Sequence, residues 1–296
     1  MPWNTDPLIL ATLVLLVGGY ARGVTIVWRR AGVGAVVSRW RVAAFALGAY
    51  VLMLALLSPL DAWAHVLFSA HMLQHVLLML VAAPLLVLGA PLVPLLWALP
   101  RGWRRSIARG WNATPWLGRA WHALTGPVVV WCVLSVTLWV WHLPGPYQAA
   151  VRLASVHALE HATMLGASLL FWWVVVQPVG QRRIDGGSAL LLVFTTKVQS
   201  ATLGAIITFV PTPIYPLYEA GAALAGMTPM QDQHLAGLIM GTAGGLVFLA
   251  AGAYVFLSWL ASIERRHRPA GAAYPRVVRA PPLDLGRSRD HSLRNT

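Results

Sequence analysis

Two pairs of histidines, each spaced four residues apart, interrupt long apolar segments of this chain. His71 and His75 lie in "HMLQH", and His157 and His161 lie in "HALEH". Residues four apart share one face of an α-helix, so each pair can present two imidazoles to the same small ion. Imidazole suits zinc, copper, iron and nickel, whereas thioethers favour Cu(I). The two pairs therefore predict an ion site between two helices.

Further polar and thioether side chains lie close to these pairs in the sequence. If residues 62–83 form one helix, a single stripe runs along it from Asp61 to Met79, and a further histidine opens a later helix in "MQDQH". The predicted metal ligands are His65, His71, His75, His157, His161, His234 and Met72. The predicted orienting groups are Gln74, Glu160, Asp232, Asp61 and Lys197, of which the lysine should face inward and meet a carboxylate or a carbonyl. A role for His142 is left open.

The composition places these residues in a membrane protein. Of 296 residues, 58% are hydrophobic and only 10% are charged, which is far from a soluble domain. Runs of about 20 apolar residues can cross the hydrocarbon core. The fold class predicted is an all-α polytopic helix bundle with seven transmembrane helices, at about 7–28, 40–57, 62–83, 126–142, 155–177, 188–210 and 233–260.

Arginines orient this predicted bundle. They gather in the first, third and fifth loops and in the tail, which places these segments in the cytoplasm and the N-terminus outside. The formal charge of +13 is then a topology signal, and no nucleic-acid partner is expected. Residues 1–264 form the predicted membrane domain in contact with lipids, and residues 265–296 a basic, disordered cytoplasmic tail. The first apolar segment lacks a cleavage site and is expected to stay.

Two connecting segments test the count of seven. Residues 84–100 contain four prolines and are interpreted as a broken continuation of the third helix at the inner interface. Residues 101–122 alternate tryptophan with arginine and predict a surface helix or loop at the headgroups. The single cysteine, Cys132, excludes an internal disulfide and a CxxC motif.

Three rival functions remain at this stage. A haem-binding membrane cytochrome also uses inward histidines, but it takes one histidine from each of two helices rather than two from one. "HALEH" matches the H-x-x-E-H pattern of inverted zincins, with Glu160 as general base; the further carboxylate ligand would have to be Glu219 or Asp232. Transport of a cation past Lys197 lacks support from broken helices or internal symmetry.

The third helix from "SPLDAWAHVLFSAHMLQHV", together with "HALEH" and "MQDQHLAGLIMG", resembles the CtaG family of cytochrome c oxidase assembly proteins over about residues 40–262. The resemblance implies a bacterial plasma-membrane protein that helps mature a haem-copper oxidase by handling copper, with no catalytic turnover. The family's histidine positions match His65, His71, His75, His157, His161 and His234. Oxidase subunits are the implied partners, a periplasmic copper chaperone is a further candidate, and Cu(I) is the favoured ion.

Overall fold

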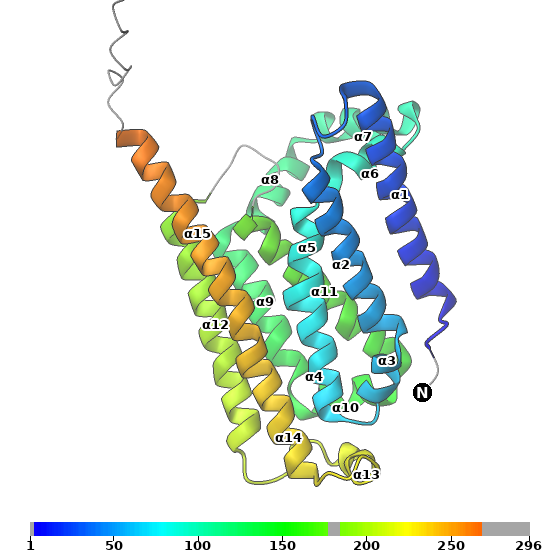
Figure 1. Ribbon diagram of the computed structural model, residues 1–296, viewed down its shortest axis with the longest axis vertical. Helices are drawn as coiled ribbons and strands as arrows, with labels where there is room; N and C mark the ends of the chain where they lie inside the picture. The colour runs from blue at the N-terminus through cyan, green and yellow to red at the C-terminus, as the bar shows by residue number, and fades with distance from the viewer. Residues whose placement is uncertain (1–2, 177–183, 268–296) are drawn as a thin grey trace, which may run out of the picture. The chain divides into compact units, whose positions relative to one another are not determined.

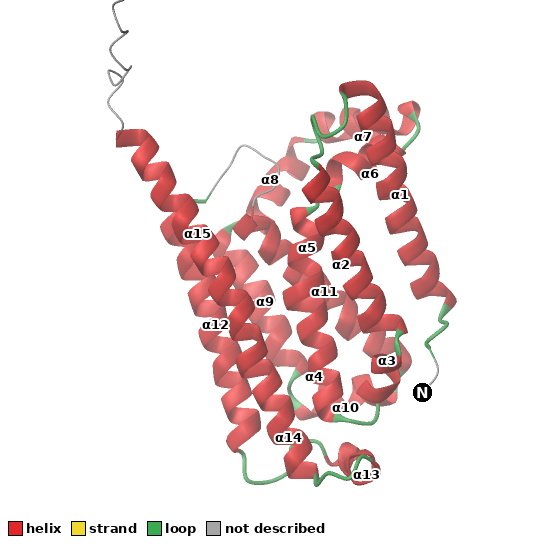
Figure 2. Cartoon of the chain, in the orientation of Figure 1, coloured by secondary structure: helices red, strands yellow, loops and turns green. Residues whose placement is uncertain are grey.

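The computed structural model describes residues 3–176 and 184–267, and the regular structure of these residues is entirely helical (Figures 1 and 2). The all-α prediction is therefore confirmed. The chain divides into two compact units, Met1–Trp259 and Leu260–Thr296. The predicted disordered tail falls from residue 268 onward outside the described residues, as do Arg182 and Arg183, and the boundary at residue 264 stays a prediction.

Six helical stretches of the described chain are long and apolar enough to cross a membrane, or seven if one bent pair forms a single span. These stretches are α1 (Pro7–Ala31), α2 (Arg39–Leu57), Phe68–Leu88 built from α4 (Phe68–Val76), η1 (Leu77–Ala82) and α5 (Ala83–Leu88), α11 (Ala154–Val176), α12 (Gly186–Phe209), and Pro229–Ala261 built from α14 (Pro229–Leu238), η3 (Ile239–Ala243) and much of α15 (Gly244–His267). The bent pair is α8 (Pro115–Leu124) and α9 (Pro127–Trp141), at 62°. The fold is compatible with a multi-pass membrane protein.

Shorter helices connect these stretches. They are α3 (Pro59–Ala64), α6 (Leu92–Ala98), α7 (Arg101–Ala113), α10 (Pro144–Arg152), η2 (Pro216–Tyr218) and α13 (Glu219–Leu224). Within the first unit, α6 and α7 lie at one end, and α10 and α13 lie at the other (Figure 1). The arginine-rich connection and the connections near the histidines are therefore at opposite ends of the bundle.

The third predicted span is not one continuous helix. α4 begins where the backbone N–H groups of Phe68 and Ser69 donate to the carboxylate of Asp232 on α14, at 2.7 and 3.0 Å. The first N–H groups of a helix have no partner within the helix and need such acceptors. A residue far along the chain thus fixes where α4 starts. The predicted unbroken stripe from Asp61 to Met79 is wrong for this reason.

The proline-rich segment after the third span is broken as predicted. α6 follows α5 after a turn in which Ala90 adopts a φ of 48°, and α6 packs closely on α1. A Cβ on Gly23 would lie 1.8 Å from the carbonyl oxygen of Pro94, so only glycine permits this approach. The guanidinium of Arg104 on α7 lies 4.2 Å from the ring centroid of Trp97. α7 buries no residue, which agrees with the predicted surface helix.

Two π-helical turns interrupt the apolar spans: η1 lies within Phe68–Leu88, and η3 lies within Pro229–Ala261. Each leaves backbone carbonyls without their usual helical partners, and in each a side chain from a neighbouring helix supplies a donor. Trp172 Nε1 donates to the carbonyl oxygen of Met79 at 2.9 Å. The Lys197 ammonium donates to the carbonyl oxygen of Gly241, which is the carbonyl option predicted for this lysine. π-helical turns often occur at functional sites.

Candidate metal centre

Four buried side chains from two helices bring potential ligand atoms together inside the bundle. His71 and His75 come from α4, and Glu160 and His161 come from α11. One ligand atom of each residue lies within 4.8 Å of all the others. The exposed fraction of these residues is 9% or less. The structure therefore places the two sequence motifs face to face, and we call these four residues the histidine cluster.

The spacing within the histidine cluster is that of an ion-sized centre. Nε2 of His71 lies 3.0 Å from Nε2 of His75 and 3.5 Å from Oε2 of Glu160, and Nε2 of His75 lies 3.7 Å from Oε1 of Glu160. Nitrogen and oxygen ligands at about 2.0–2.2 Å from a tetrahedral metal are roughly 3.3–3.6 Å apart. A metal ion could therefore be shared by these atoms after small shifts.

Several acceptor atoms of the histidine cluster have no hydrogen-bond partner. They are both carboxylate oxygens of Glu160 and Nε2 of His161. A buried carboxylate without a hydrogen bond from the protein is costly, because no protein donor replaces its hydration. A bound cation would remove that cost, as would a proton on Glu160. The donor set fits a metal ion better than it fits a packed apolar core.

Tyr218 contacts Nδ1 of His71, which leaves Nε2 of the same ring facing the histidine cluster. Its hydroxyl oxygen lies 3.2 Å from Nδ1 of His71, and its O–H donates to the carbonyl oxygen of Ala64 at 3.2 Å. Burial raises the pKa of Tyr218, so the phenol keeps its proton. When the Tyr218 proton is directed to Ala64, the Tyr218 oxygen can accept from the N–H at Nδ1 of His71. Neutral His71 then carries its lone pair on Nε2, which is the atom that faces the cluster.

Replacing Tyr218 by phenylalanine tests this assignment. The variant should bind Cu(I) about 10–100-fold more weakly than the wild type, because such orienting partners contribute this much to metal affinity. The measurement is competition for Cu(I) against a chelator of known affinity. Tyr20→Phe is the matched control, since its buried hydroxyl also donates to a carbonyl, that of Gly89 at 2.9 Å, away from the histidine cluster. Equal affinities of both variants would contradict the assignment.

A second group of potential ligands lies beside the histidine cluster and reaches the protein surface. It contains Asp61, His65 and His157. His65 ends α3 and is exposed, whereas His157 is buried. The His65 and His157 rings are 4.7 Å apart between centroids, and the His157 and His161 rings are 4.1 Å apart. We call these three residues the surface group, because they connect the buried cluster with the exterior of the bundle.

His234 is the predicted histidine ligand that the structure does not bring to either group. The buried face of α14 contains Asp232, Gln233, Ala236 and Gly237. His234 follows Gln233, and the next residue of a helix points about 100° away. The His234 side chain is therefore exposed. The predicted close approach at the glycines does occur, since a Cβ on Gly237 would lie 2.7 Å from the carbonyl oxygen of Gly204 on α12, but it does not draw His234 inward.

Most of the predicted orienting residues form hydrogen bonds with backbone groups, and one of them also binds the carboxylate of Asp61. Gln74 donates to Oδ1 of Asp61 at 2.9 Å and to the carbonyl oxygen of Ala55 at 2.7 Å, so it positions the surface group. Asp232 caps α4, and Lys197 holds η3, as described above. Met72, which was predicted as a metal ligand, is fully buried but lines a neighbouring cavity and belongs to neither group. Among these orienting candidates, Glu160 has a different place, because its oxygens lie among the ligand nitrogens.

Tyr218 and Met240 contribute to this region although no sequence pattern pointed to them, and His142, whose role the sequence left open, also lies here. Tyr218, the last residue of η2, gives no signal of its own in the sequence, because its partner His71 lies on a distant helix. Glu160 had a signal, since a carboxylate inside an apolar span is expensive and usually functional. The sequence predicted it as a group that orients imidazoles, whereas the structure places its oxygens among the ligand nitrogens.

The two rival chemistries find little geometric support. The zincin reading needs a third ligand, but Asp232 already accepts two backbone hydrogen bonds and Glu219 is exposed. The haem reading needs a flat gap between two imidazoles. The rings within the pairs instead lie in contact, with centroids 4.4 Å apart for His71 and His75, as suits a small ion.

Comparisons with known proteins identify the family to which this sequence is similar. The family described as cytochrome c oxidase caa3 assembly factor matches residues 18–262. Uncharacterized proteins Mb0105 of Mycobacterium bovis and MT0111 of Mycobacterium tuberculosis are each 26% identical over 242 residues, which are 79% of this chain and 36% of theirs. Uncharacterized protein ML1998 of Mycobacterium leprae is 25% identical over 269 residues, 87% of this chain and 39% of its own. The chain thus spans less than half the length of these relatives, and no solved structure matches it.

Proposed function

Because the chain belongs to the family of cytochrome c oxidase caa3 assembly factors, which matches residues 18–262, we propose that it contributes to oxidase assembly by carrying copper as cargo. The proposed binding site is the histidine cluster. The observation that carries the proposal is the group of three imidazoles and one carboxylate whose ligand atoms lie within 4.8 Å of one another. An imidazole-rich site with thioethers nearby and no cysteine favours copper, and Cu(I) in particular.

A carrier must exchange its ion with a donor and an acceptor, and the graded burial of the two groups supports such exchange. The exposed His65 could take up or release the ion. His157 would then pass it inward, because its ring lies 4.1 Å from His161 and 5.4 Å from His71 between centroids. Each step replaces one imidazole by another, so the ion never has to cross an apolar gap without ligands.

The arginine pattern supports an outward-facing surface group. Cytoplasmic segments carry an excess of arginine, and α7 and its neighbours lie at the end of the bundle opposite α10 and α13 (Figure 1). We therefore place the α7 end in the cytoplasm and the surface group toward the outside of the plasma membrane. The proposed partners on that side are a subunit of the oxidase and a copper donor.

Replacing Glu160 by glutamine tests the proposal, because Glu160 provides the one carboxylate among the four residues of the histidine cluster. The variant keeps the size of the side chain but removes the negative charge that would neutralise a bound cation. We expect the affinity for Cu(I) to fall by about 10–100-fold, with the fold retained. The measurement is a chelator competition with the purified protein. Glu219→Gln is the matched control, because Glu219 is exposed and should leave the affinity unchanged. Equal affinities of both variants would remove Glu160 from the site.

A further inference from the structure

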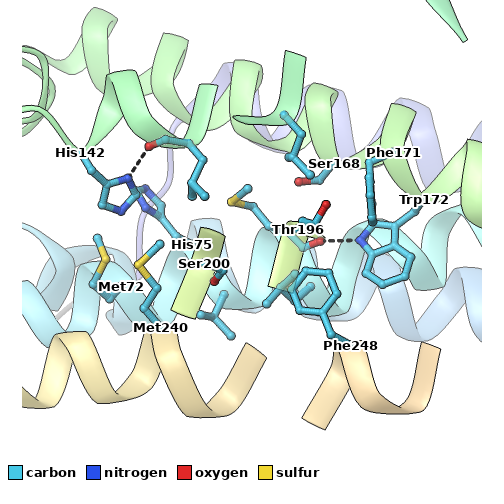
Figure 3. A pocket seen from close by; sticks show the side chains of 15 residues that line it. Met72, His75, His142, Ser168, Phe171, Trp172, Thr196, Ser200, Met240 and Phe248 are labelled. Carbon is cyan, nitrogen blue, oxygen red and sulfur yellow. Dashed lines mark hydrogen bonds between the residues drawn. The ribbon is translucent and has the colours of Figure 1, made fainter. Parts of the chain in front are cut away.

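A cavity lies next to the histidine cluster. The two share His75, but the other side chains that line the cavity are different from those of the cluster. The cavity lies among α4, η1, α9, α11, α12, η3 and α15 and has a volume of about 40 Å³. Its lining includes Met72, Met79, Met240, His75 and His142 (Figure 3). This volume accommodates an ion or a few water molecules, whereas cofactors such as haem need pockets of about 300–1,000 Å³. No carboxylate lines it.

His142 offers a metal ligand to this cavity. Its Nδ1 lies 2.7 Å from the carbonyl oxygen of Leu138, and only a protonated Nδ1 can form that hydrogen bond. The neutral ring therefore has its lone pair on Nε2. That atom is buried and has no hydrogen-bond partner, in a side chain that is 7% exposed. A fixed tautomer with a free, buried lone pair is the arrangement found in metal-binding histidines.

Three thioethers face the same space. Met72 comes from α4, and the other two come from the π-helical turns, Met79 from η1 and Met240 from η3. Figure 3 shows the sulfur atoms of Met72 and Met240 directed toward the end of the cavity where the rings of His75 and His142 lie. The hydrogen bond from Trp172 holds the carbonyl of Met79, which anchors the π-helical turn that carries one of these sulfurs.

We propose that this cavity is a second copper site, in which the thioethers of Met72, Met79 and Met240 and Nε2 of His142 bind Cu(I). Thioethers are soft, neutral ligands that select Cu(I). A site with no carboxylate also favours a monovalent ion, because each additional buried charge costs free energy. The proposal rests on the proposed function and deepens it, since it gives the cargo ion a second position in the chain.

His75 connects the two sites. Its Nε2 lies in the histidine cluster, 3.0 Å from Nε2 of His71, and its ring also lines the cavity, 6.1 Å from the ring of His142 between centroids. Nδ1 of His75 is buried without a hydrogen-bond partner. The ion therefore passes between the sites by exchange of ligands around His75. The imidazole-rich cluster and the thioether site differ in softness, so they bind Cu(I) with different affinities.

The test compares the purified 296-residue chain with a variant in which Met72, Met79 and Met240 are all replaced by leucine. Leucine has a similar volume to methionine, so such swaps usually cost little stability. Cu(I) is added without oxygen, and two quantities are measured: the number of ions bound against a competing chelator, and the sulfur shell around copper by X-ray absorption. Met164→Leu is the matched control, because Met164 is fully buried in the same hydrophobic cluster but does not line the cavity.

The wild type and Met164→Leu should bind two ions and show sulfur around copper. The triple variant should lose one ion and the sulfur shell, and Met240→Leu alone should weaken binding of the second ion by at least about tenfold. Unchanged stoichiometry and an unchanged sulfur shell in these variants would overturn the second site. If the wild type binds one ion with only nitrogen and oxygen ligands and His161→Ala abolishes it, the second site fails but the proposed function stands. If the wild type binds no copper, both fail.

Discussion

Replacing His71 and His75 together by alanine is expected to abolish copper binding to the histidine cluster and to leave cells without active oxidase. The double change removes two of the three imidazoles whose ligand atoms lie within 4.8 Å of one another. One imidazole and one carboxylate would remain, too few for a tetrahedral site. The measurements are copper per protein by elemental analysis and oxidase activity in membranes of a strain that carries only the variant.

His234→Ala is the control for this double variant. His234 lies on an otherwise similar span, and sequence patterns suggested it as a ligand, but its side chain is exposed and belongs to neither group. Its replacement should leave copper content and oxidase activity at wild-type levels. Wild-type copper content and activity in the double variant would make the histidine cluster a structural feature. A loss of activity in His234→Ala equal to that in the double variant would remove the distinction on which the site assignment rests.

Replacing Asp232 by alanine should destabilise the protein by about 2–5 kcal/mol. The carboxylate is 1% exposed and accepts from the N–H groups of Phe68 and Ser69, so its removal leaves two buried donors without acceptors. Because these residues start α4, we also expect weaker Cu(I) binding by His71. The measurement is the thermal unfolding midpoint of the purified protein in detergent, with and without Cu(I).

Asp6→Ala is the matched control for this cap. Asp6 also accepts from two backbone N–H groups at a helix start, those of Leu8 and Ile9 at 2.7 and 3.2 Å, but it is exposed. Water can replace its hydrogen bonds, so the unfolding midpoint should fall much less and copper affinity should not change. Similar losses in both variants would show that the Asp232 cap contributes no more than an ordinary exposed one.

The helical spans and the two histidine pairs could be predicted because their signals are local. Apolar runs of sufficient length predicted the spans, and spacings of four residues predicted that His71 pairs with His75 and His157 with His161. The predicted location of the spans agrees with α1, α2, α11 and α12 to within a few residues. That α4 and α11 lie face to face was a hypothesis supported only by the matching depth of the two pairs.

The parts that could not be predicted depend on contacts between distant residues. The break before α4 requires Asp232, which is 164 residues from Phe68. The hydrogen-bond partner of His71 Nδ1 is Tyr218, 147 residues away. His234 was assigned to the wrong face because the contacts of α14 with α4 and α12 decide which side of α14 is buried. These contacts cannot be predicted from the spacing of the residues within "MQDQH". Met240 joins the cavity only through the π-helical turn η3.

The central claim is that this chain binds copper, and elemental analysis combined with a visible spectrum of the purified wild-type protein tests it most directly. We predict a protein without a Soret band that binds stoichiometric copper after exposure to Cu(I), through the cluster of His71, His75, Glu160 and His161. A Soret band with stoichiometric haem and no copper would contradict the claim.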